Sequence, residues 1–86
     1  MRTIIVTGIS LIRIYADFNN QDESGRVQLI TPDSLADLAL HQNQLRTGVA
    51  VVLYTQPEDY VEVNAILVYD DQQAIWLADW SAYRDR

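Results

Sequence analysis

The strongest constraint on this fold is the spacing of apolar residues in the C-terminal half of the chain. Segments rich in β-branched and aromatic residues occur at 49–54, 60–69 and 74–80. The last two alternate between apolar and polar positions, which is typical of strands with one buried face. Turn-forming residues separate the segments at 56–59 and 70–73. We therefore predict a three-stranded antiparallel meander, in which the uniformly apolar segment 49–54 is buried on both faces.

The two turns also predict how the strands pair. The second turn pairs Leu67 with Trp76, and the first pairs Val52 with Val63, so that all four side chains share one face. This apolar face holds Ala50, Val52, Tyr54, Val61, Val63, Ala65, Leu67, Trp76, Ala78 and Trp80. Both tryptophans are thus predicted to pack in the core, because a shift of one residue would scramble the face.

Large aliphatic residues also occupy the opposite face of the predicted meander. They are Ile66, Val68, Ile75 and Leu77, with Val49, Val51 and Leu53 on the neighbouring strand. A contiguous apolar patch of this kind is seldom left in water. The helix, the N-terminal strands or a second copy of the protein would have to cover it. The candidate interface is therefore Ile66, Val68, Ile75, Leu77, Val51 and Leu53.

The N-terminal half predicts further strands. Residues 10–18 alternate cleanly and place Ile12, Ile14, Ala16 and Phe18 on one face. A strand is also expected at 3–6, with Gly8 marking a turn or bulge after it. The polar loop 19–25 leads to a short strand at 26–30.

One helix is expected, at about residues 33–43. Thr31 or Asp33 can cap it, and Pro32 suits its first turn. Leu35, Leu38 and Ala39 would form its buried stripe.

Together these segments predict a mainly β fold in a single domain, residues 1–86. Its expected form is a small antiparallel bent sheet or SH3-like barrel of five to six strands with one short helix. An α+β sandwich, with the helix flat on a four-stranded sheet, is the alternative.

Composition excludes several classes of function. The net charge is −6, and all six cationic side chains are scattered arginines, so direct binding of nucleic acid is not expected. The same charge disfavours an anionic membrane surface, and no stretch is long enough to span a bilayer. The absence of cysteine excludes disulfides and thiolate metal sites and fits a cytoplasmic protein.

Two patterns resemble functional sites but lack essential parts. His41 lies four residues after Asp37, the spacing of a carboxylate that orients an imidazole base, but no nucleophile accompanies them. Asp17 begins an alternation of oxygen-bearing side chains like that of a calcium loop. Asp22 and Gln28 occupy the positions where such a loop needs glycine and glutamate. We therefore expect no catalytic, cofactor-binding or metal-binding residues, and no cofactor.

These observations favour a small non-enzymatic protein-interaction module that binds a protein partner or forms a homodimer. The alternative is an acidic inhibitor or nucleic-acid mimic that blocks a basic protein surface, since the chain is small, acidic and free of lysine.

Overall fold

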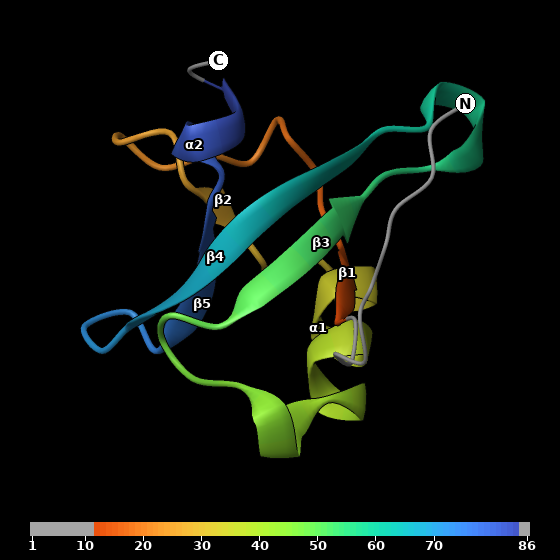
Figure 1. The fold of residues 1–86 in the computed structure, drawn as a ribbon. Coiled ribbons are helices and arrows are strands. Elements are labelled where there is room, and N and C mark those ends of the chain that lie inside the picture. Colours follow the sequence, from red (N-terminus) through yellow and green to blue (C-terminus); the bar gives the residue numbers. More distant parts are fainter. Residues whose placement is uncertain (1–11, 85–86) are drawn as a thin grey trace.

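The computed structural model describes residues 12–84, which form a curled five-stranded sheet resembling half of a barrel (Figure 1). The elements are β1 (Arg13–Tyr15), β2 (Val27–Gln28), α1 (Pro32–Leu40), the 3-10 helix η1 (Gln42–Gln44), β3 (Ala50–Tyr54), the 3-10 helix η2 (Pro57–Asp59), β4 (Glu62–Asp70), β5 (Ile75–Asp79) and α2 (Ser81–Arg84). The strand order is β1-β3-β4-β5-β2. The predicted mainly β fold with one short helix, consistent with a small SH3-like barrel, is confirmed.

The sheet is mixed rather than wholly antiparallel. β1 runs parallel to β3, whereas β3, β4, β5 and β2 pair antiparallel in turn. The expected strand at 3–6 and the turn at Gly8 lie outside the described residues. None of the helices within residues 12–84 is long and apolar enough to cross a membrane.

The core lies on the concave face of the sheet. Its buried members are Ile12, Ile14, Ala16, Val27, Leu29, Leu38, Val51, Leu53, Val63, Ala65, Leu67 and Ala78. The predicted alternations in 10–18 and 26–30 are confirmed where they are described, because these strands turn their apolar positions inward. Trp76 and Trp80 are partly buried and pack against this core, as the meander predicted.

β3 is the most deeply enclosed strand. Val51, Val52 and Leu53 are all buried although consecutive residues point to opposite faces, so both faces of the strand are covered. Hydrogen-bonded neighbours flank it on both sides, β1 and β4. The predicted central position of this segment is confirmed.

The predicted pairing of β3 with β4 is wrong by one residue. Leu53, not Val52, lies opposite Val63. The cause is the loop at η2: the Thr55 amide N–H donates to the Val61 carbonyl at 3.1 Å, so the loop encloses residues 56–60 rather than 56–59. Because the loop is one residue longer than predicted, the side chains of β3 exchange faces. Val51 and Leu53 point into the core, whereas Ala50, Val52 and Tyr54 lie on the opposite face.

The predicted pairing of β4 with β5 is displaced by two residues. Leu67 lies opposite Ala78 rather than Trp76, and Trp76 lies opposite Tyr69. The loop comprises residues 71–74, one position later than expected, because Ala74 adopts a left-handed conformation with φ of 57°. A shift of two preserves the side-chain faces, so the buried face of β4 and β5 was assigned correctly.

Helix α1 begins as predicted, but its buried face is different. The Thr31 hydroxyl accepts the Ser34 amide N–H at 3.1 Å, and Pro32 lies in the first turn. Leu38 is buried as expected. Leu35 and Ala39, which the apolar stripe placed inside, are exposed, and the fully buried position is Ser34 instead.

Ser34 is buried because α1 seals the free edge of β1. Outward-facing backbone groups of an edge strand need partners when they are covered. The Ser34 hydroxyl donates to the Tyr15 carbonyl at 2.6 Å, and the Tyr15 amide N–H donates to the Asp37 carboxylate at 2.9 Å. Helix side chains thus replace a missing neighbouring strand, and α1 lies beside β1 rather than flat across the sheet (Figure 1).

Replacing Ala74 with glycine should stabilise the protein. An L-residue with a positive φ is strained by roughly 1–2 kcal/mol, and glycine removes this strain. Glycine also has greater freedom in the unfolded chain, which offsets part of that gain. We expect Ala74→Gly to raise the free energy of unfolding by about 0.5–1 kcal/mol, measured by urea denaturation.

Ala36→Gly is the matched control. This exposed residue lies inside α1, where glycine is about 1 kcal/mol less favourable than alanine. It should therefore lower stability. A loss of stability with Ala74→Gly as well would contradict the proposed shape of the β4–β5 loop.

Candidate functional site

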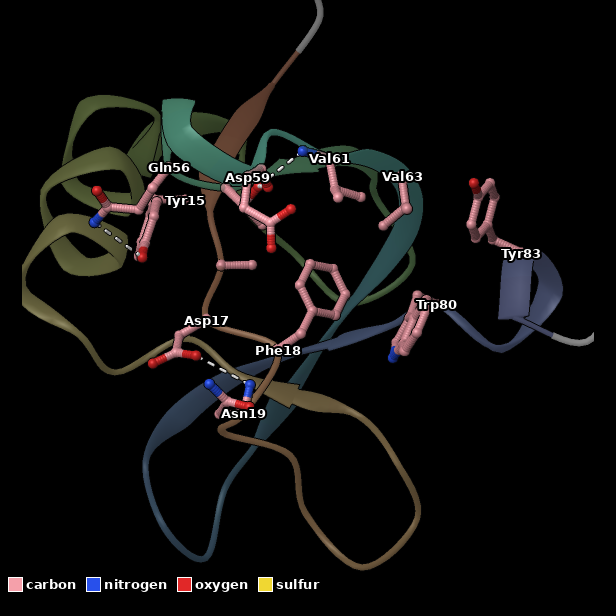
Figure 2. Close-up of a pocket in the computed structure, with 12 residues that line it drawn as sticks. Tyr15, Asp17, Phe18, Asn19, Gln56, Asp59, Val61, Val63, Trp80 and Tyr83 are labelled. Carbon is pink, nitrogen blue, oxygen red and sulfur yellow. Dashed lines mark hydrogen bonds between the residues drawn. The ribbon is translucent and has the colours of Figure 1, made fainter.

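An open cleft lies at the end of the half-barrel where the chain leaves β1 and β3 (Figure 2). Its volume is about 500 Å³. The residues that line it are Tyr15, Ala16, Asp17, Phe18, Asn19, Thr55, Gln56, Asp59, Val61, Val63, Trp80 and Tyr83. Its walls are mainly aromatic and aliphatic, and we call it the aromatic cleft.

One side of the aromatic cleft is built from three aromatic rings in contact. Phe18 meets Trp80 edge to face, with ring centroids 4.9 Å apart, and Trp80 stacks on Tyr83 at 6.4 Å. The indole N–H of Trp80 donates to the Gly25 carbonyl at 2.9 Å. The N–H is thereby satisfied by the loop before β2, while the ring faces the cleft (Figure 2).

Aliphatic side chains from β4 and the segment before it continue this wall. Val63 is buried, whereas Val61 remains 41% exposed and points into the cleft beside it (Figure 2). An exposed valine beside the partly buried Phe18 and Trp80 and the exposed Tyr83 leaves apolar surface in contact with water, and covering that surface with a ligand is favourable.

Polar groups form the rim of the aromatic cleft. The Asp17 carboxylate accepts the Asn19 amide N–H at 3.0 Å, which fixes the turn after β1. On the other side, the Gln56 side-chain amide donates to the Tyr15 hydroxyl at 3.3 Å. Asp59 adds a second carboxylate near the opening (Figure 2).

A second, smaller pocket lies on the far side of Tyr15 and Gln56. Its volume is about 320 Å³. It is lined by Tyr15, Asp33, Ala36, Asp37, Tyr54, Thr55, Gln56 and Pro57. Because it contains two aspartates from α1, we call it the carboxylate pocket.

Asp37 organises the carboxylate pocket. Its Oδ2 atom accepts the Tyr54 hydroxyl at 2.7 Å as well as the Tyr15 amide N–H at 2.9 Å. The hydrogen bond to Asp37, together with desolvation, raises the pKa of Tyr54 to about 12. The two rings meet edge to face at 5.9 Å, and the Arg13 guanidinium lies 4.9 Å from the Tyr54 ring centroid.

The six residues of the candidate interface do not form one surface. Val51 and Leu53 point into the core, because β3 is turned by one residue relative to the prediction. On the opposite face Leu77 is also buried, at 1% exposure. Of the six, the structure leaves Ile66 exposed at 41% and Val68 and Ile75 partly buried.

The other two patterns have local structural roles. Asp37 bonds to Tyr15 and Tyr54, and within residues 12–84 it makes no hydrogen bond to His41, which ends α1. In the loop before β2, Asp22 accepts backbone N–H groups of Ser24 and Arg26. No group of three or more potential metal ligands is found among the described residues.

Neither pocket is predicted by the sequence patterns. Alternation assigns Phe18 and Trp80 to the core, although both end beside an opening, and it does not include Tyr83. One sequence feature could have indicated the aromatic cleft. Phe18 and Trp80 stand at the ends of their alternating segments, and the last inward side chain of a strand is only partly covered.

Comparison with known protein families, curated proteins and solved structures found no match, so the site is interpreted from its own geometry.

The raised pKa of Tyr54 gives a test of the Asp37 contact. Because its pKa is higher in the folded protein than its ordinary value of 10, the contact stabilises the fold fully below pH 10, and this contribution is lost as the pH rises towards 12. Titration of the Tyr54 ring resonances by NMR should give a midpoint near 12.

Asp37→Asn should bring that midpoint back towards 10, because it removes the hydrogen bond from the Tyr54 hydroxyl to a carboxylate and also the repulsion between that carboxylate and the phenolate. An unchanged Tyr54 titration in this variant would show that Asp37 is not the cause of the raised pKa.

Proposed function

We propose that this protein is a non-enzymatic interaction module that binds a segment of a partner protein in the aromatic cleft. The observation that carries the proposal is the wall of Phe18, Trp80 and Tyr83 beside the exposed Val61. Aromatic side chains are enriched at protein interfaces because they offer large apolar areas and lose little conformational freedom on binding. The proposal includes a cytoplasmic location for the protein, which the absence of cysteine favours.

The shape of the cleft supports a peptide rather than a small metabolite. Small-molecule sites commonly enclose most of their ligand's surface. The aromatic cleft is open along one side (Figure 2) and is followed beyond Tyr15 by a second pocket. An extended chain can place apolar side chains in such a surface while its backbone stays partly hydrated.

The groups in the cleft favour binding over catalysis. Its described residues include neither histidine nor cysteine, and its two carboxylates are Asp17, from the loop after β1, and Asp59, from η2. A general base needs a reacting group held within hydrogen-bond reach, and no nucleophile and base meet here in that way.

A homodimer through the opposite face of the sheet is the second candidate. Ile66 is exposed there, with the partly buried Val68 and Ile75 on the same face. This patch is smaller than the predicted six-residue surface, because Val51, Leu53 and Leu77 are buried. The aromatic cleft therefore has the stronger support.

The distribution of charge disfavours the acidic mimic. Several carboxylates are used inside the fold: Glu62 pairs with Arg13, Asp22 pairs with Arg26, and Asp37 seals β1. The remaining ones among residues 12–84 are spread over the loop after β1, the start of α1, η2, the β4–β5 loop and its flanks, and the end of β5. A mimic of nucleic acid would need them aligned as one strip.

Selection from a random peptide library displayed on phage tests the proposal with the full chain as bait. We expect enriched peptides rich in apolar residues, whose binding changes the emission of Trp80. Val61→Glu should weaken that binding about tenfold or more, because the segment would bury an unpaired carboxylate against apolar surface.

Ile66→Glu is the matched control, since Ile66 and Val61 have the same exposed fraction of 41%. Its binding to the selected peptides should equal that of the wild type. Absence of enriched peptides, or equal losses in both variants, would refute the cleft as the binding site. Loss of self-association in Ile66→Glu alone, seen by sedimentation, would favour the homodimer.

A further inference from the structure

We infer that the carboxylate pocket continues the binding surface of the aromatic cleft as a second subsite. It would select an arginine or lysine side chain in the peptide segment that the aromatic cleft binds. This inference rests on the proposed function and adds the chemistry of the partner: an apolar segment followed or preceded by one cation. It is carried by the contiguity of the two pockets, by their charge and by the prearranged position of Asp37.

The two pockets form one continuous surface. Tyr15, Thr55 and Gln56 line both of them. The partition between them is the hydrogen bond from the Gln56 amide to the Tyr15 hydroxyl, which is exposed and 3.3 Å long. A segment lying on Phe18 and Val61 can therefore cross this partition and continue towards α1 (Figure 2).

The two carboxylates of the carboxylate pocket form no ion pair with the described part of the chain. Within residues 12–84, no cationic side chain lies within ion-pair distance of Asp33 or Asp37. The Arg13 guanidinium lies over the Tyr54 ring, but its ion pair is with Glu62. Among residues 12–84 the two carboxylates of the pocket thus have no ion-pair partner, and a peptide cation would complement them.

Asp37 is held in place before any ligand arrives. Two neutral donors, the Tyr15 amide and the Tyr54 hydroxyl, fix its Oδ2 atom without cancelling its charge. A carboxylate has about four acceptor positions, so Oδ1 and the remaining lone pair can still accept from a guanidinium or ammonium group.

The walls of the pocket also suit a cation. The rings of Tyr15 and Tyr54 stand edge to face at 5.9 Å, and Tyr54 already contacts one guanidinium on its face. Electron-rich tyrosine faces attract cations, and the volume of about 320 Å³ accommodates one long side chain. Together the pockets predict one apolar and one cationic position in the ligand.

The peptide library described above also tests this inference. Enriched peptides should carry arginine or lysine at a constant distance from their apolar residues. For a synthetic peptide of the most enriched sequence, replacing that arginine by citrulline should weaken binding about 3–10-fold, measured by calorimetry at low salt, and added salt should reduce the difference.

Asp33→Asn is the variant of choice, because Asp37 also seals the edge of β1 and its replacement would change the seal and the pocket together. It should weaken binding of the arginine peptide about 3–10-fold and leave the citrulline peptide unaffected. Asp71→Asn, in the exposed β4–β5 loop and outside both pockets, changes the net charge equally and should leave both affinities unchanged.

The outcomes separate this inference from the proposed function. Enriched peptides that bind through Val61 but lack a constant cation, or equal effects of Asp33→Asn and Asp71→Asn, would overturn the cationic subsite and leave the cleft intact. If no peptide is enriched, both proposals fail. A cation preference that Asp33→Asn abolishes and Asp71→Asn retains supports the subsite.

Discussion

The seal that helix α1 places on strand β1 is the interaction on which the rest of this structure depends. Only three residues form β1, and its outer edge would otherwise expose backbone groups next to the core. Ser34 and Asp37 satisfy the carbonyl and the N–H of Tyr15, so that a short parallel strand can end the sheet. Buried polar groups of this kind are costly when unpaired, and here each has its partner.

The same contacts create the candidate site. Asp37 accepts hydrogen bonds from Tyr54 and from Tyr15, and both tyrosines line the carboxylate pocket, while Tyr15 also lines the aromatic cleft. At the other end, Trp80 is tied to Gly25 and packs on Phe18, so the loop before β2 supports the aromatic wall. The proposed binding surface therefore lies where the two edges of the curled sheet are closed by loops and helix rather than by strands.

Much of the fold could be predicted from the sequence, because alternation reports burial directly. It placed Ile14, Val27 and Leu67 inside and identified β3 as covered on both faces. Strand pairing was less accurate, since it depends on loop geometry: an extra loop residue at η2 and a left-handed Ala74 are not visible as patterns. The site was missed because its parts come from separate segments, and because Ser34 and Asp37 read as surface residues until β1 is known to be an edge.

Native-state hydrogen exchange of the Tyr15 amide tests this account most directly. The account predicts strong protection in the wild type, because this amide donates to Asp37, and loss of that protection in Asp37→Ala. The Ala16 amide, which donates to the Tyr54 carbonyl of β3 at 2.9 Å, should stay protected in both proteins. Exchange of the Tyr15 amide at the rate of an unstructured peptide in the wild-type protein would contradict the seal and the site built upon it.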